Sequence, residues 1–326
     1  MGISIRFDNA PKGTKNLITD VPGVLVGHKT IAHGKIQTGV TAILPHSGDL
    51  FHEKVPAAVH VINGFGKSSG LMQVQELGTI ETPLLLTNTL SVGTCFDALA
   101  RYMVERNPDI CDTTSSVNPM VLECNDSVLN DTRGFHVTQE DAYESLAAAD
   151  SNFEEGAVGG GRGMCCYQMK GGIGSASRVV CLDGRNYCVG ALVMTNFGSM
   201  RDLIIAGDPV GKKLTKRLEQ EADKGSIITV LATDIPLTQR QLARIAALYL
   251  EGGRAFGRQL LSQRWVDLSL GRLAYPDGFR DEGGYNFHWR RREGCWLAGG
   301  MYGQTCAIAP QLGTALVMTA ADPADR

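Results

Sequence analysis

Residues Gly225–Thr233 read GSIITVLAT, and this stretch decides how the rest of the chain is interpreted. The β-branched, apolar run after Ser226 is typical of a buried β-strand. A glycine–serine pair in front of a strand is most often a turn. It is also the arrangement that a self-processing nucleophile needs. In that case the Ser226 hydroxyl attacks the Gly225 carbonyl, cuts the chain and leaves Ser226 as a new N-terminus with its own amine as the base.

The composition limits the class of protein. The chain has 326 residues, of which 43% are hydrophobic and 20% charged, as in soluble globular proteins. A net charge of −3 gives no sign of binding to nucleic acid or to an anionic membrane. No run is apolar enough for a signal peptide or a membrane span. The nine cysteines are irregularly spaced without a Cys-x-x-Cys pair, which favours reduced thiols. We therefore expect a cytoplasmic protein with no nucleic-acid or membrane partner.

Strand-like and helix-like segments alternate before and after the opening stretch. The expected strands are residues 24–26, 40–44, 57–62, 83–87, 178–182, 187–194 and 227–233. The expected helices are residues 92–105, a segment that Thr138 opens with capping chemistry, 214–221 and 238–250. No regular β-α-β rhythm and no internal repeat appear. The pattern predicts a mixed α/β layered fold.

A near-continuous set of motifs resembles the L-aminopeptidase/D-esterase family, the DmpA-type β-peptidyl aminopeptidases, over about residues 14–246. The motifs are residues 16–28 (NLITDVPGVLVGH), 63–71 (NGFGKSSGL), 77–83 (LGTIETP), 87–94 (TNTLSVGT), 123–126 (ECND) with 129–131 (LND), 156–163, 195–198 (TNFG) and 225–234. The resemblance implies an αββα-type sandwich of the kind found in N-terminal-nucleophile hydrolases, and a homotetramer.

The same resemblance implies roles for single residues. Ser226 is the catalytic serine freed by cleavage after Gly225, and Asn196 donates a hydrogen bond to the oxyanion. Glu123 is the candidate for gripping the substrate's free amino group. Asn63 and Gly64 open a glycine-rich loop. The loop fits neither of the phosphate-binding motifs Gly-x-x-x-x-Gly-Lys-Ser/Thr and Gly-x-Gly-x-x-Gly, so we assign it to the substrate pocket, with a core turn as the alternative. The histidines show no ligand spacing, and we expect neither a metal nor a cofactor.

Two departures from the family pattern bear on activity. Ser127 and Val128 stand where an aromatic residue is expected after Glu-x-Asn-Asp. Residues 247–326 also lack the family's glycine-rich region with a second serine and an acidic residue. They resemble instead the C-terminal end of serine β-lactamase-like esterases, in particular at residues 296–304 and 308–310. We therefore expect a DmpA-like domain over 1–246, a β-lactamase-like fragment over 247–326, and an apparent chimera.

Three functions follow from these patterns. The first is a self-processing serine aminopeptidase that hydrolyses amide or ester bonds of short peptides with a free N-terminal L-, D- or β-amino acid. The second is an amide hydrolase of the same superfamily acting on ω-amino acid oligomers. The third, from another class, is an inactive scaffold or binding protein that has lost its C-terminal catalytic support.

Overall fold

The computed structural model describes residues 10–59, 61, 65–205, 208–214 and 225–238, together with short strands between 254 and 318. The chain divides into two compact units. The first unit comprises residues 1–55 and 67–236, and the second comprises 56–66 and 237–326. The expected domain boundary at residue 246 lies outside the described residues.

The first unit contains a four-stranded sheet with the order β1-β2-β5-β6. Its strands are β1 (Leu25–His33), β2 (Ile36–Leu44), β5 (Leu84–Asn88) and β6 (Met120–Cys124). β1 and β2 form an antiparallel hairpin, and β5 runs parallel to β6. Such a parallel pair needs a crossover connection, which contains helix α2 (Val92–Arg106).

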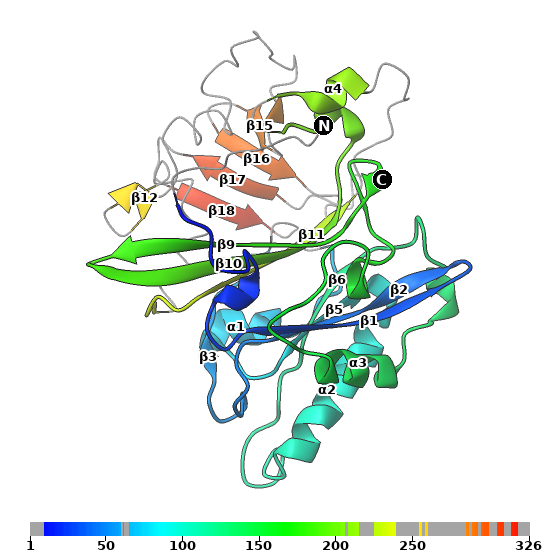
Figure 1. The fold of residues 1–326 in the computed structure, drawn as a ribbon, viewed down its shortest axis with the longest axis vertical. Coiled ribbons are helices and arrows are strands. Elements are labelled where there is room, and N and C mark those ends of the chain that lie inside the picture. The colour runs from blue at the N-terminus through cyan, green and yellow to red at the C-terminus, as the bar shows by residue number, and fades with distance from the viewer. Residues whose placement is uncertain are drawn as a thin grey trace. The chain divides into compact units, whose positions relative to one another are not determined.

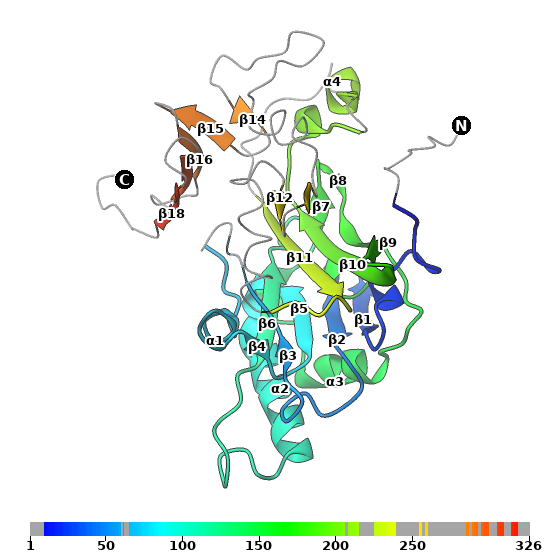
Figure 2. The same cartoon turned by 90° about the vertical axis from the view of Figure 1, so that its left-hand side faces the viewer.

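Helices α2 and α3 (Gln139–Ala147) cover one face of this sheet (Figures 1 and 2). The apolar positions of α2 at helical spacing are all buried, namely Val92, Cys95, Ala98, Leu99 and Met103. The first four pack with Val40, Leu85 and Val121 of the sheet in one core, whereas Met103 belongs to a second cluster with Phe51 and Ile110. Thr138 begins α3 with a capping box to Asp141, as its capping chemistry predicts.

A second, antiparallel sheet lies on the opposite face of the first, and its strand order is β11-β10-β9 (Figures 1 and 2). Its strands are β9 (Gly172–Leu182), β10 (Arg185–Asn196) and β11 (Ser226–Thr233). Leu192 and Met194 of β10 are fully buried. Between the sheets runs the turn Gly159–Gly161, where a side chain at Gly160 would come within 2.6 Å of the Leu86 carbonyl oxygen. The described layers are therefore helix, sheet, sheet, in agreement with a mixed α/β sandwich.

The remaining elements are short. In the first unit they are η1 (Ile18–Asp20), α1 (Leu71–Leu77), β4 (Thr79–Ile80), η2 (Thr89–Ser91), η3 (Thr132–Gly134), β7 (Cys165–Cys166), β8 (Met169–Lys170), η5 (Met200–Asp202) and α4 (Val210–Leu214), with β3 (Val55–Pro56) at the boundary between the units. None of the helices in these described ranges is long and apolar enough to cross a membrane.

The second unit contains a two-stranded sheet and a five-stranded sheet with the order β14-β15-β16-β17-β18. The strands are β12 (Arg254–Ala255), β13 (Arg258–Gln259), β14 (Tyr285–Asn286), β15 (Trp289–Arg292), β16 (Cys295–Gly299), β17 (Thr305–Ala309) and β18 (Thr314–Met318). β16 and β17 are antiparallel neighbours, and they include residues 296–299 and 308–309 of the two stretches that resemble a terminal strand pair.

Two expectations differ from what the structure describes. Residues 57–59 form no strand, and only the two-residue strand β3 precedes them. Proline at position 56 cannot donate a ladder hydrogen bond, which limits pairing there. Of the helix expected at 214–221, the structure describes only Leu214, the last residue of α4. The helix expected at 238–250 lies outside the described residues apart from Thr238.

Candidate active site

Ser226 is the first residue of β11 and stands directly opposite Asn196, the last residue of β10, in the antiparallel register. This pairing brings the two side chains together. Asn196 Nδ2 donates a hydrogen bond to Ser226 Oγ at 3.3 Å. Asn196 is buried, and the Ser226 side chain is half-buried. The structure thus joins the predicted nucleophile to the predicted oxyanion donor.

The orientation of the Asn196 amide is fixed from its other side. The backbone N–H of Cys165 donates to Asn196 Oδ1 at 3.0 Å. Because the oxygen is used by Cys165, the NH₂ group is the end that faces Ser226. Strand β7, which begins at Cys165, therefore sets which atom Asn196 presents to the nucleophile.

A second donor reaches Ser226 from the other sheet. The backbone N–H of Asn125, the residue after β6, donates to Ser226 Oγ at 3.2 Å. Both donors meet at Ser226 Oγ, and the oxygen of a carbonyl attacked by Oγ would come to lie beside them, which is the condition that an oxyanion site has to meet. Sequence reasoning missed this donor, since a main-chain N–H has no residue-type signature.

Gly225 lies against the end of β10. A Cβ built at this position would come within 2.5 Å of Phe197 Cα and 2.6 Å of the Asn196 carbonyl oxygen. These contacts are with backbone and with a side-chain base, which cannot move aside easily. Only glycine therefore fits in front of Ser226, in agreement with its place in the expected cleavage site.

The other titratable group beside Ser226 is the thiol of Cys124. The thiol is buried, and Cys124 Sγ donates to the Met194 carbonyl oxygen at 3.7 Å. Burial raises the pKa of this thiol to about 12, so it stays protonated at neutral pH. A thiolate nucleophile at Cys124 is therefore disfavoured. Within the described part of the chain, no imidazole or carboxylate forms a hydrogen bond to Ser226 Oγ, so no side-chain base is in contact with this hydroxyl.

Glu123 lies near the site on β6, but its carboxylate points away from Cys124, because successive side chains of a strand face opposite sides. The Lys67 N–H donates to Glu123 Oε1 at 3.0 Å, and the Thr89 hydroxyl donates to Oε2 at 2.5 Å. The carboxylate thus holds the backbone of the glycine-rich loop at Lys67. The two other predicted substrate-binding residues, Asn63 and Gly64, lie outside the described residues.

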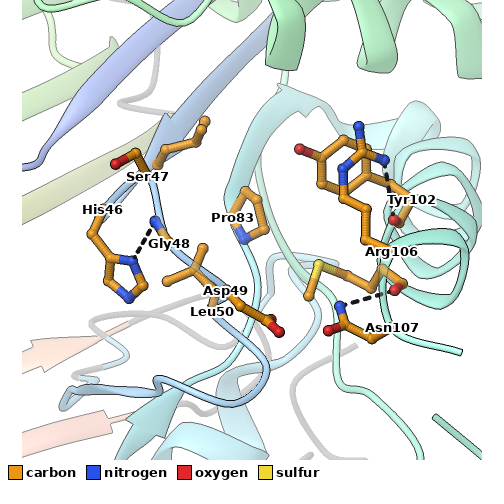
Figure 3. A pocket seen from close by; sticks show the side chains of 11 residues that line it. His46, Ser47, Gly48, Asp49, Leu50, Pro83, Tyr102, Arg106 and Asn107 are labelled. Atoms are coloured by element: carbon orange, nitrogen blue, oxygen red, sulfur yellow. Dashed lines mark hydrogen bonds between the residues drawn. The ribbon is translucent and has the colours of Figure 1, made fainter. Parts of the chain in front are cut away.

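A cavity of about 210 Å³ lies elsewhere in the first unit, between the loop after β2 and the end of α2 (Figure 3). Its lining includes His46, Asp49, Tyr102 and Arg106, and none of the predicted site residues. The Arg106 guanidinium lies over the Tyr102 ring, 3.5 Å from its centroid. The cavity is therefore separate from the Ser226 site.

Comparison with known proteins identifies the family. The profile of peptidase family S58 matches residues 16–259, about three quarters of the chain. The chain belongs to peptidase family S58. This membership agrees with the resemblance that the sequence motifs carry.

A curated relative is a β-peptidyl aminopeptidase, BapA, of Sphingosinicella microcystinivorans, which is 38% identical over 269 residues. The match covers 75% of this chain and 66% of that protein, slightly less than two thirds of its length. Part of the relative's sequence therefore lies outside the match with this S58 chain.

Two solved structures are similar to the S58 chain. The PH0078 protein of Pyrococcus horikoshii OT3 is 52% identical, with a TM-score of 0.72 over 78% of this chain and 74% of that one. The L-aminopeptidase D-Ala-esterase/amidase of Ochrobactrum anthropi is 38% identical, with a TM-score of 0.68 over 78% and 74%. The latter is described as a variant of the Ntn hydrolase fold. The fold class expected from the sequence is confirmed.

Proposed function

We propose that this S58 protein is a self-processing serine aminopeptidase in which Ser226 is the nucleophile. In the processing step Ser226 Oγ bonds to the Gly225 carbonyl carbon, the Gly225–Ser226 C–N bond breaks, and the hydroxyl proton goes to the departing amine. Water then hydrolyses the resulting ester and releases the Gly225 carboxylate. The products are chains of 225 and 101 residues.

Processing supplies the base that the resting site lacks. The new α-amine of Ser226 has an ordinary pKa of about 7.7–8.0, so a useful fraction is neutral near pH 7.5. This amine takes the proton from Oγ as the hydroxyl attacks a substrate carbonyl, and later passes it to the leaving amine. Water then hydrolyses the acyl-enzyme and frees Ser226 for the next turnover.

The observation that carries the proposal is the convergence of two donors on Ser226 Oγ. Asn196 Nδ2 lies 3.3 Å from this oxygen and the Asn125 N–H nitrogen 3.2 Å from it, from two different sheets. Both stabilise the negative charge that develops on the attacked carbonyl. Relatives named as aminopeptidases support hydrolysis of an N-terminal residue. The role predicted for Glu123 in binding the substrate's amino group is not part of this scheme, because its carboxylate faces away from Cys124 and already accepts hydrogen bonds from Lys67 and Thr89.

Intact mass and N-terminal sequencing of the purified chain test the proposal. We expect two fragments, the second beginning at Ser226, and turnover of an aminoacyl-p-nitroanilide. Ser226→Ala is expected to stay uncut and inactive, because one hydroxyl serves both reactions. Cys124→Ala is the matched control for a change beside the hydroxyl and is expected to be processed. A new terminus at any other residue, or none after prolonged incubation, rules out the proposal.

The same experiment separates the alternatives. An inactive scaffold predicts a single uncut chain. An ω-amino acid oligomer hydrolase predicts cleavage at Ser226 with turnover of ω-amino acid oligomers and none of aminoacyl-p-nitroanilides. Residues 247–326 favour neither outcome by themselves, since their resemblance to β-lactamase-like esterases concerns only a fragment without that family's Ser-x-x-Lys motif.

A further inference from the structure

Asp126 is a buried carboxyl beside the site that the proposed chemistry leaves unused. Its side chain has no solvent exposure. Thr132 Oγ1 donates to Asp126 Oδ1 at 2.9 Å, and Asn130 Nδ2 donates to Oδ2 at 3.1 Å. Burial raises the pKa of the Asp126 carboxyl. Burying a carboxyl group removes it from water and costs free energy when its partners are neutral. A buried polar network whose groups are all hydrogen-bonded makes the local structure rigid.

The network fastens the turn after β6 to the neighbouring hairpin. The Asp126 carbonyl oxygen accepts the Asn130 N–H at 3.0 Å, so the turn closes on itself. The Gln37 N–H donates to Asn130 Oδ1 at 2.9 Å, and the Asp131 N–H donates to the Lys35 carbonyl oxygen at 2.9 Å. The turn is therefore anchored to the start of β2.

A third contact reaches Asp126 from inside the sheet. Asn88 Nδ2, at the end of β5, donates to Thr38 Oγ1 at 2.9 Å. The Thr38 side chain also lies beside the Asp126 carboxyl, where it lowers the pKa of that group against the effect of burial. Strands β2 and β5 and the turn after β6 thus meet at one carboxyl group. Asn88, Thr38 and Asp126 are buried, which shields this part of the network from competing water.

We propose that Asp126 is a positioning residue, whose buried carboxyl fixes the turn at 126–132 so that the Asn125 N–H points at Ser226 Oγ. The direction of that N–H depends on the backbone on both sides of it. On one side β6 holds Cys124, its last residue, in the sheet. On the other side the first side chain tied to the sheet is Asp126. This inference rests on the proposed function, since it gives the Asn125 N–H a catalytic role.

Asp126→Asn tests the proposal because it keeps the shape and turns one acceptor oxygen into a donor facing other donors. We expect kcat to fall about 10- to 100-fold with KM changed less than about threefold, a smaller loss than deletion of an oxyanion donor causes. Thr132→Val, which removes one donor and keeps the volume, is expected to lower kcat in the same direction by less. Hydrogen exchange at residues 125–132 is expected to accelerate in both variants, while β10 stays protected.

Glu81→Gln is the matched control. Glu81 is also a buried carboxyl, and the Asn118 N–H and side-chain amide both donate to its Oε1 at 2.8 Å. We expect this variant to lose stability and keep its kcat. If wild type is active and both Asp126→Asn and Thr132→Val are as active as wild type, this inference alone is wrong. It is also wrong if Glu81→Gln loses as much kcat as Asp126→Asn. A wild type that neither cleaves itself nor hydrolyses substrate overturns the proposed function, and this inference with it.

Discussion

At the scale of single residues, side-chain chemistry could be predicted from the sequence and main-chain chemistry could not. The roles predicted for Ser226 and Asn196 come from side chains in motifs that resemble the family, and the structure places these two residues opposite each other. The Asn125 N–H is equally close to Ser226 Oγ, but every residue except proline has such a donor. Its direction depends on the fold, so no motif could have revealed it.

Removing the side-chain donor at Asn196 is expected to slow turnover strongly. Asn196→Ala deletes one of two donors to the oxyanion, and the expected fall in kcat is about 10²- to 10³-fold. Steady-state kinetics on a processed sample measures it. Asn186→Ala, at the exposed opposite end of β10, is the control and is expected to keep the wild-type rate. A full rate in Asn196→Ala would mean that another group stabilises the oxyanion.

Adding a methyl group at Gly225 is expected to block or slow processing. The new Cβ of Gly225→Ala would lie 2.5 Å from Phe197 Cα, so the carbonyl must move away from the Ser226 hydroxyl. Attack needs the reacting atoms at about 3–3.5 Å, and a shift of ~1 Å can cost about 100-fold in rate. A time course on denaturing gels checks this. Gly93→Ala, where an added Cβ meets nothing within 4 Å, should process normally; cleavage of Gly225→Ala at the wild-type rate would contradict the steric argument.

At the scale of secondary-structure elements, apolar periodicity predicted six of the seven strands in the two larger sheets of the first unit, all except β6, and two helices; it failed where one face of an element is polar. The strand expected at 24–26 is the start of β1, which continues to His33 through His28, Lys29 and Thr30 because β2 pairs with it throughout. β1 is an edge strand of its sheet, so its polar residues break the apolar pattern without ending the strand. Residues 57–59 show the opposite error, an apolar run that gains no strand partner.

A histidine links the loop after β2 to the segment after α2 and predicts a pH dependence. His52 Nδ1 pairs with Asp49 Oδ2 at 2.6 Å, and Nε2 pairs with Asp109 Oδ2 at 3.0 Å. The hydrogen bond to Asp49 and then that to Asp109 raise the pKa of His52 above its ordinary value of 6.5. Because the folded pKa is the higher one, this stabilisation is fully present below pH ~6.5 and is lost as pH rises through the folded pKa. The ion pairs are exposed, so the effect is small and weakens with salt.

The measurement is the difference in melting temperature between wild type and His52→Gln as a function of pH. We expect wild type to be the more stable protein near pH 6 and the two to converge as the solution becomes alkaline. His33→Gln, at an exposed end of β1, controls for loss of a histidine as such. A difference that grows with rising pH would contradict the assigned sign.

At the scale of the whole molecule, the proposed processing would leave two chains, which the β9–β11 sheet of the first unit would have to hold together. The proposed cut is directly before β11, whose eight residues Ser226–Thr233 pair with β10 from Asn196 back to Val189. Ile228 and the half-buried Val230 add apolar contact on the inner face of β11. The strand that begins at Ser226 would thus remain part of the sheet after cleavage.

We therefore expect the fragments of 225 and 101 residues to stay associated until the fold itself is lost. Size-exclusion chromatography with light scattering of processed wild type should give one species with the mass and elution volume of uncut Ser226→Ala, which we expect from the family to be a homotetramer. In denaturant the fragments should separate for wild type only. The hydrogen bonds between β10 and β11 break cooperatively, so the two fragments should separate only when the fold unfolds. A flexible tail with few contacts would dissociate without unfolding of the rest. Loss of the 101-residue chain from the native peak would show that the β10–β11 pairing does not survive cleavage, and a smaller native mass would exclude the tetramer.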